Sequence, residues 1–197
     1  MVHRVARLLP LVALAVAAAL VVVLALQNRA LRAQAESLCE RATEPYVGLV
    51  VPTFQALTLA GDSVTIGEAA PGELQLLFVF NTRSHASLET LPGWTTIVSE
   101  LNRGTARRVA VYCVSLDPEP ETRRFVADLN LPFPVVRFPE RKLARLYRVG
   151  RVPLTLVLDH EGEIVHSYSG PLSEGASTDS VVSAIRQATS ATAVTDE

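Results

Sequence analysis

Cysteine is scarce in this chain of 197 residues, which contains two, Cys39 and Cys113. Neither belongs to a Cys/His pattern with the spacing of zinc ligands, so neither a metal site nor a cofactor is predicted. An excess of positive charge is also absent, because 18 basic residues stand against 20 acidic ones and the formal net charge is −2. Since nucleic-acid-binding proteins are expected to present a basic surface, this balance argues against nucleic acid as a partner.

Charge is missing altogether between Leu8 and Leu26, and two arginines stand on either side of this apolar run. Its 19 residues, at about 1.5 Å each, reach about 28 Å, enough for the hydrocarbon core of a bilayer. We therefore expect residues 1–35 to form a membrane anchor that crosses the membrane through residues 8–26. A cleaved signal peptide is the alternative, although its apolar region is usually shorter and its small-x-small site closer than Ala33-Gln34-Ala35.

The flanking arginines say little about which end of this anchor faces the cytoplasm, because they are balanced on the two sides and the positive-inside rule depends on a difference between them. The short N-terminal side favours a domain outside the cytoplasm. Residues 36–45 are a predicted stalk and contain Cys39. In an oxidising compartment this thiol could form an intermolecular disulfide; the simpler interpretation is an incidental thiol near the membrane surface.

From residue 46 onward, patterns typical of strands and helices alternate. Predicted strands cover 54–59, 63–66, 76–80, 107–116, 135–138, 154–158 and 163–168, and predicted helices cover 87–101, 119–131, 140–147 and 178–188. This order predicts an α/β domain over residues 46–188, with a central mixed sheet and helices on both faces. Pro92 is expected to kink the first helix, and residues 189–197 are expected to be a flexible tail.

The chemistry of the chain depends on the segment from Leu76 to Trp94. A short apolar run, 76–80, predicts a buried strand, and a polar corner then leads into a helix. The first N–H groups of a helix are unpaired and carry positive potential, which lowers the pKa of a thiol placed there in redox proteins. Here Ser84 and Ser87 hold the two positions at that spacing, and the segment contains no cysteine.

This segment resembles the active-site segment of thioredoxin-like proteins, in particular the membrane-anchored TlpA-like (redoxin, AhpC-TSA type) branch. That family has C-x-x-C with a proline five residues after the second cysteine, where this chain has Ser84-His85-Ala86-Ser87 and Pro92. The segment from Val149 to Gly162 resembles the family's second hallmark, in which Pro153 takes the place of a cis-proline. The resemblance covers about residues 46–187. It implies a thioredoxin-like fold, a domain on the extracytoplasmic (periplasmic) side, and a family role in thiol-disulfide oxidoreduction.

A serine hydroxyl is a far weaker acid than a thiol and cannot form a disulfide. A serine nucleophile needs an adjacent base that a third group holds in place. His85 follows Ser84 directly, but adjacent helical residues do not face each other, and the other histidines, His3, His160 and His166, lie elsewhere. We therefore expect Ser84 to cap the helix, its hydroxyl accepting a backbone N–H, and His85 to be an exposed residue, and the sequence does not favour a serine hydrolase.

The resemblance further predicts that the Val152–Pro153 bond is cis and faces the Ser84 corner, where the family offers a backbone edge to bound polypeptide. A trans proline that opens a strand is the alternative. Cys113 lies in the apolar strand 107–116. It is therefore predicted to be a buried small hydrophobe with a raised pKa, and a compensating redox thiol is the alternative.

Together these observations predict a membrane-anchored thioredoxin-like domain that is redox-inactive. The domain is expected to bind polypeptide or another partner at the face of Ser84 and Pro153. The alternative is an active thiol-disulfide oxidoreductase or thiol-dependent antioxidant that uses Cys113 or Cys39.

Overall fold

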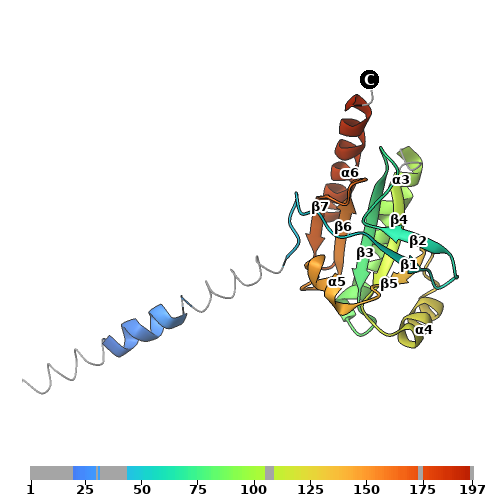
Figure 1. The fold of residues 1–197 in the computed structure, drawn as a ribbon. Helices are drawn as coiled ribbons and strands as arrows, with labels where there is room; N and C mark the ends of the chain where they lie inside the picture. Colours follow the sequence, from blue (N-terminus) through green and yellow to red (C-terminus); the bar gives the residue numbers. More distant parts are fainter. Residues whose placement is uncertain (1–19, 30, 32–43, 105–108, 173–174, 196–197) are drawn as a thin grey trace, which may run out of the picture. The chain divides into compact units, whose positions relative to one another are not determined.

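The computed structural model of the protein describes residues 20–29, 31, 44–104, 109–172 and 175–195 (Figure 1). The chain divides into two compact units, Met1–Thr43 and Glu44–Glu197. In the first unit residues 20–29 are helical, and their large apolar side chains are exposed. Residues 8–19 of the expected anchor, and Cys39 with most of the expected stalk, lie outside the described residues. Within the part of the chain that is described, no helix has both the length and the apolar character needed to cross a membrane.

The second unit is built on a five-stranded mixed sheet with the order β5-β4-β3-β6-β7. Its strands are β3 (Leu74–Phe80), β4 (Val109–Ser115), β5 (Val135–Arg137), β6 (Leu154–Leu158) and β7 (Ile164–Ser169). β4 runs parallel to both β3 and β5, whereas β6 runs antiparallel to β3 and β7. Every residue of β3 and β6 is buried, and apart from Gln75 and Thr155 both strands are apolar in sequence, as expected of strands that are covered on both faces.

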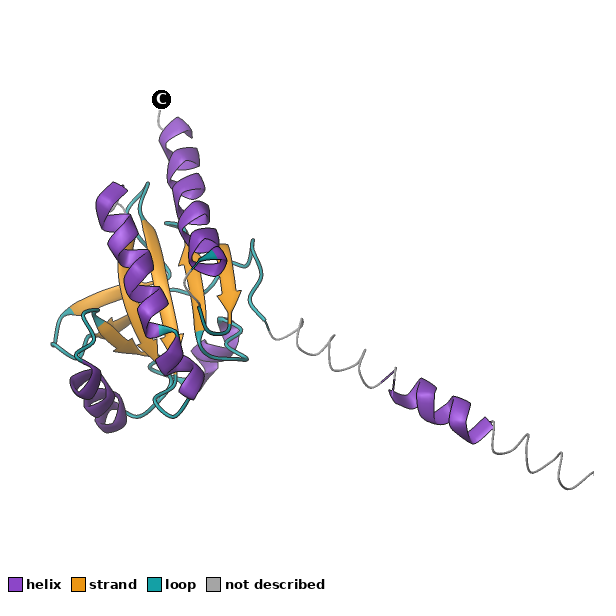
Figure 2. Ribbon diagram, turned by 180° about the vertical axis from the view of Figure 1, so that it is seen from behind, coloured by secondary structure: helices purple, strands orange, loops and turns teal. Residues whose placement is uncertain are grey.

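One face of this sheet is covered by three helices, α3 (Leu91–Gly104), α4 (Glu119–Leu129) and α6 (Ala176–Thr195) (Figure 2). Trp94 of α3 stacks on Phe78 of β3 with ring centroids 4.7 Å apart. The indole Nε1–H of Trp94 donates to the hydroxyl of Thr155 at 3.2 Å. The largest side chain on this face is therefore both buried in apolar surroundings and hydrogen-bonded, as a buried indole requires.

The opposite face is covered by the antiparallel hairpin of β1 (Phe54–Leu57) and β2 (Ser63–Ile66) and by the short helix α5 (Arg141–Leu146). The rings of Phe54, Phe138 and Tyr147 pack together here with centroids 5.2–5.8 Å apart. The structure confirms the predicted α/β architecture of a mixed sheet with helices on both faces.

The hairpin is attached to the sheet by Gln75, a buried polar residue of β3. Its side-chain oxygen accepts the backbone N–H of Gly67 at 2.8 Å. Its amide nitrogen donates to the carbonyls of Thr65 and Glu68 at 2.8 and 2.9 Å. Because every polar atom of this amide is paired, its burial does not destabilise the core.

All four predicted helices differ from their observed bounds, α4 and α5 by one or two residues at an end and the other two by more. The segment predicted as one kinked helix forms α2 (His85–Glu89) and α3, separated at Thr90. Pro92 is the second residue of α3, in a first turn where its missing N–H costs no helical hydrogen bond. Helix α6 continues to Thr195, beyond the predicted end at residue 188. No glycine or proline interrupts these last residues, so the helical hydrogen bonding can continue.

Candidate functional site

The strand register brings three chain segments to one edge of the sheet. Phe80 at the end of β3 lies beside Ser115 at the end of β4, and Ser115 lies beside Arg137 at the end of β5. β6 runs the other way, so its first residue, Leu154, pairs with Val79. The corner after β3 and Pro153 therefore share the edge at the carboxyl ends of the parallel strands, where open α/β sheets bind their ligands.

Ser84 is the residue directly before helix α2 (His85–Glu89), and its backbone is extended, with φ −86° and ψ 117°. The prediction that its hydroxyl caps the helix is wrong, because the side chain makes no capping hydrogen bond. The backbone closes this turn instead, since the carbonyl of Ser84 accepts the N–H of Ser87 at 3.0 Å. The half-buried Ser84 hydroxyl is therefore left without a hydrogen-bond partner among the described residues.

Ser87, the second serine of the frame, is fully buried. Its hydroxyl oxygen accepts the backbone N–H of Asn81 at 3.4 Å. The two hydroxyls therefore differ in environment, with one partly open to solvent and one turned into the protein.

The histidines are not placed to activate Ser84. The side chain of His85 is 84% exposed, as predicted, and its Nε2 lies 3.3 Å from a carboxylate oxygen of Glu89. His160 follows the carboxyl end of β6, at the opposite edge of the sheet, and His166 pairs with Val157 in the middle of β7. No base-assisted serine nucleophile is formed by the described residues.

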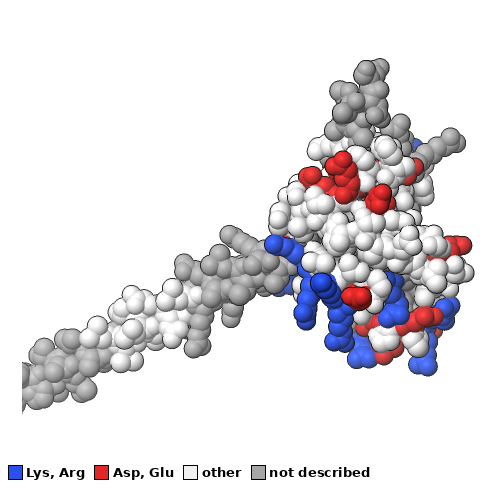
Figure 3. Space-filling view, viewed as in Figure 1, with Lys and Arg blue, Asp and Glu red and all other residues white. Residues whose placement is uncertain are grey.

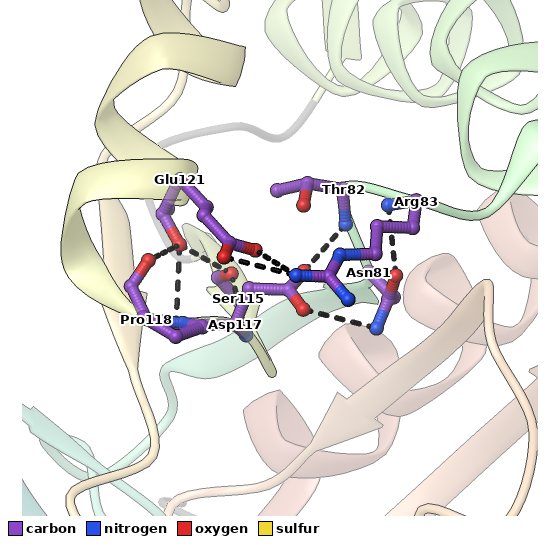
Figure 4. Close-up of polar contacts among 8 residues, drawn as sticks. Asn81, Thr82, Arg83, Ser115, Asp117, Pro118 and Glu121 are labelled. Carbon is purple, nitrogen blue, oxygen red and sulfur yellow. Dashed lines mark hydrogen bonds and ion pairs between the residues drawn. The ribbon is translucent and has the colours of Figure 1, made fainter.

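A buried carboxylate holds the corner in place (Figure 4). Asp117, two residues beyond β4, accepts the side-chain N–H of Asn81 at 3.1 Å and the backbone N–H of Thr82 at 2.6 Å. The side-chain oxygen of Asn81 accepts the N–H of Arg83 at 2.8 Å. The two hydrogen bonds to Asp117 fix the polar corner to the loop after β4, and the third closes the corner on itself. Sequence reasoning missed the contact, although Asn81 and Asp117 follow two strands whose neighbouring carboxyl ends could have indicated it.

The end of β4 and the corner are both tied to helix α4. The hydroxyls of Ser115 and Thr122 lie 2.7 Å apart in the buried interior. At the surface, one guanidinium nitrogen of Arg83 donates to both carboxylate oxygens of Glu121 at 3.0 Å. The ion pair adds little to the positioning of the corner, because exposed ion pairs contribute about 0–1 kcal/mol.

A cavity of about 640 Å³ opens beside the corner. Its polar lining includes Arg83, Asp117, Arg137 and Arg141, and its apolar lining comes mainly from residues 116, 118, 138 and 139. The Nε–H of Arg137 donates to the backbone carbonyl of Asp117 at 2.7 Å. Figure 3 shows Lys and Arg side chains gathered on the part of the domain around α5.

Cys113 is the cysteine that the described residues include, and it is fully buried in β4. The register places it between Phe78 of β3 and Val135 of β5. Burial raises the pKa of this thiol, because the thiolate would lose its hydration. The predicted interpretation of Cys113 as a core residue is confirmed.

The Val152–Pro153 peptide bond is cis, as the resemblance predicts. Pro153 is buried, and its carbonyl accepts the N–H of Gly170 at 2.8 Å.

Among the described residues, no group of three or more His, Cys, Asp or Glu side chains is placed to hold a metal ion.

Comparison with known proteins is informative at the level of family and fold. The model of the AhpC/TSA family matches residues 47–167. A putative thiol:disulfide interchange protein DsbE from Chlorobium tepidum is similar in structure, with TM-score 0.62, 20% identity, and coverage of 74% of this chain and 99% of that chain. A putative protein disulfide isomerase from Bacteroides thetaiotaomicron has TM-score 0.62 and 17% identity over 74% of this chain and 91% of that chain.

StoA from Bacillus subtilis has TM-score 0.57 and 18% identity, covering 70% of this chain and 98% of that chain. No curated protein matches the chain. At these identities the structural likeness establishes the thioredoxin-like fold.

Proposed function

The chain belongs to the AhpC/TSA family, and from this premise we propose that its thioredoxin-like domain binds polypeptide, or a partner protein, without exchanging disulfides. The binding face is the edge that carries Ser84 and Pro153. The observation that carries the proposal is the pair of hydroxyls in the C-x-x-C frame, with Ser84 half-buried and Ser87 fully buried.

Disulfide exchange requires a thiolate that attacks a disulfide sulfur, and a serine hydroxyl cannot replace it. The alternative function, an active oxidoreductase or thiol-dependent antioxidant, needs Cys113 or Cys39. Cys113 is unsuited to this role because it lies inside the sheet, where its thiol is inaccessible and burial raises its pKa. Cys39 lies outside the described residues.

Binding of polypeptide is supported by groups at the same edge. The Ser84 hydroxyl has no hydrogen-bond partner among the described residues, and the Asp117 hydrogen bonds hold the corner rigid. Leu88 of α2 and Leu116 after β4 are 38% and 37% exposed, which is high for leucine. A pre-organised corner with free hydrogen-bonding capacity and exposed apolar side chains suits an extended peptide.

Attachment to a membrane is a further part of the proposal. It is supported by the uncharged run over residues 8–26 and by the exposed large apolar side chains of residues 20–24 and 26. The domain is proposed to lie on the extracytoplasmic side, as the resemblance to membrane-anchored TlpA-like proteins implies.

The chemical part of the proposal predicts that the purified protein does not reduce insulin disulfides above background in the presence of dithiothreitol and that the double variant Ser84→Cys/Ser87→Cys does. The two new thiols would stand at the start of α2, where backbone N–H groups favour a thiolate. Turnover is followed as insulin precipitation. The single variant Ser84→Cys is the control, because one thiol cannot complete the dithiol cycle.

Two outcomes would contradict the proposal. Dithiol turnover by the unmodified protein that Cys113→Ala abolishes would establish Cys113 as a working thiol. Failure of the unmodified protein to bind an unfolded, carboxamidomethylated polypeptide in fluorescence anisotropy would remove the binding role.

A further inference from the structure

The cavity beside the corner has an unbalanced charge. Three arginines line it, Arg83, Arg137 and Arg141, against one acidic residue, Asp117. The two carboxylate oxygens of Asp117 already accept hydrogen bonds from Asn81 and Thr82, and the side chain is buried. Its two oxygens are therefore occupied by the corner, while its negative charge remains in the wall of the cavity.

The three arginines differ in how far the protein satisfies them. Arg83 is paired with Glu121 through two 3.0 Å contacts. Arg137 uses its Nε–H on the carbonyl of Asp117, and its two terminal nitrogens make no hydrogen bond with the described residues. Arg141, the exposed first residue of α5, makes neither a hydrogen bond nor an ion pair with them. Two guanidinium groups thus offer unused N–H donors at one cavity.

The Glu119 carboxylate interacts with Arg137, but it is already paired with another arginine. The hydrogen bond from Arg123, at 2.7 Å, contributes most to lowering the pKa of Glu119, and the charge of Arg137 contributes least. Glu119 therefore does not occupy the terminal nitrogens of Arg137.

Unused guanidinium donors match a carboxylate, which accepts two parallel N–H groups. A singly charged carboxylate fits better than a doubly charged phosphate, because the Asp117 carboxylate in the wall repels additional negative charge. Leu116, Pro118 and Phe138 supply an apolar wall for the carbon atoms that carry the carboxylate. The volume of about 640 Å³ lies in the usual range of ligand pockets, about 300–1,000 Å³.

We propose that this cavity is a carboxylate-binding site that selects acidic segments of the polypeptide bound at the Ser84 and Pro153 edge. The inference rests on the proposed function for its polypeptide source. A free small carboxylate is the other source of the same chemistry. Arg137 and Arg141 bind the carboxylate, and Arg83 contributes positive potential while it remains paired with Glu121.

The test uses the full chain in a mild detergent and two labelled peptides of equal length, hexaglutamate and hexaglutamine, in fluorescence anisotropy. Hexaglutamate should bind about tenfold or more tightly than hexaglutamine, the effect of one good charge-assisted hydrogen-bond pair. Arg141→Gln should weaken hexaglutamate binding by about tenfold. Arg124→Gln is the matched control, because Arg124 is an exposed arginine of α4 outside the cavity and the change in net charge is identical.

Butyrate, which carries a single carboxylate, and inorganic phosphate, added as competitors or alone, separate the sources. Binding of butyrate that depends on Arg141, with neither peptide bound, would keep the carboxylate site and overturn peptide docking. Equal binding of the two peptides, both insensitive to Arg141→Gln, would overturn the carboxylate site while leaving peptide docking intact. Equal losses for Arg141→Gln and Arg124→Gln would show non-specific charge attraction, and tighter binding of phosphate than of butyrate would refute the carboxylate preference.

Discussion

At the scale of single residues, His166 is an unusual polar group. It lies on β7 opposite Val157, and its Nε2 is buried without a hydrogen-bond partner in the described part of the chain. Burial lowers the pKa of this imidazole, because the charged form loses hydration that no protein group replaces. Folding therefore favours neutral His166.

The stability of the domain should consequently depend on pH. A lowered pKa in the folded state means that the unfolded chain binds more protons as the pH falls below the ordinary histidine pKa of about 6.5. The contribution of His166 is therefore fully present above that value and is lost as the pH falls through the pKa of the folded state. Urea unfolding should give a smaller free energy of unfolding at pH 5 than at pH 7.5, and His166→Val should reduce this difference.

The control for this experiment is His85→Gln, which removes a histidine whose side chain is 84% exposed. It should leave most of the difference between the two pH values in place. An unchanged difference in His166→Val would show that other groups cause the pH dependence.

Single residues were also where sequence reasoning was least complete. The paired positions of Ser84 and Ser87 and the core role of Cys113 followed from local pattern, because each depends on neighbours in the chain. Gln75 and Asp117 did not, because their partners lie outside any local motif. Asp117 contacts Asn81 across 36 positions of sequence, and only the pairing of parallel strands brings such residues together.

At the scale of elements, α3 makes an unusually close approach to the chain before α6. A Cβ atom added at Gly93 would lie 2.8 Å from both the Cβ and the carbonyl oxygen of Leu172. The N–H of Leu172 donates to the hydroxyl of Thr90 at 2.8 Å, so this segment is held against the start of α3. Glycine at position 93 is therefore required by packing.

Gly93→Ala should therefore destabilise the protein, although alanine is the better helix former by about 1 kcal/mol. The added methyl group would force Leu172 and its backbone outward, and such overpacking typically costs about 1–3 kcal/mol. Chemical denaturation measures the free energy of unfolding. Asn102→Ala, at an exposed position of the same helix, is the control and should be neutral or slightly stabilising. A stabilised Gly93→Ala protein would show that the contact relaxes freely.

Among the elements, the buried strands were the most predictable. β6 was predicted with its observed bounds, and β3 was predicted from Leu76, two residues inside its start. Strands buried on both faces consist mostly of apolar residues and are therefore visible in the sequence, and the polar Gln75 is the residue that hid the first two positions of β3. Helix ends were less predictable. Helix α2 ends at Thr90, whose hydroxyl accepts the N–H of Leu172, 82 positions away, and local sequence does not reveal such a contact.

At the scale of the whole molecule, the chain joins an apolar N-terminal unit to a domain whose candidate site lies at one edge of its sheet. The arginines of the cavity and the corner serines come from segments that the parallel strand order brings to that edge. This arrangement is compatible with the proposed binding of a partner, which would need no reactive thiol. A membrane anchor would confine the site to partners on one side of a membrane.

This placement is tested by the position of the domain relative to the membrane. In a bacterium with an outer membrane, added protease should cut the domain in spheroplasts and not in intact cells, because the uncharged run over residues 8–26 would hold it on the outer side of the inner membrane. The double variant Ala17→Arg/Ala18→Arg should leave the domain in the cytoplasm and protected, since each arginine at the centre of a membrane helix costs about 2.5–3.5 kcal/mol. Ala33→Arg, outside the apolar run, is the control and should behave as the unmodified chain. Protection of the unmodified domain in spheroplasts would refute the extracytoplasmic placement, and release of the domain as a soluble fragment lacking residues 1–35 would instead identify a cleaved signal peptide.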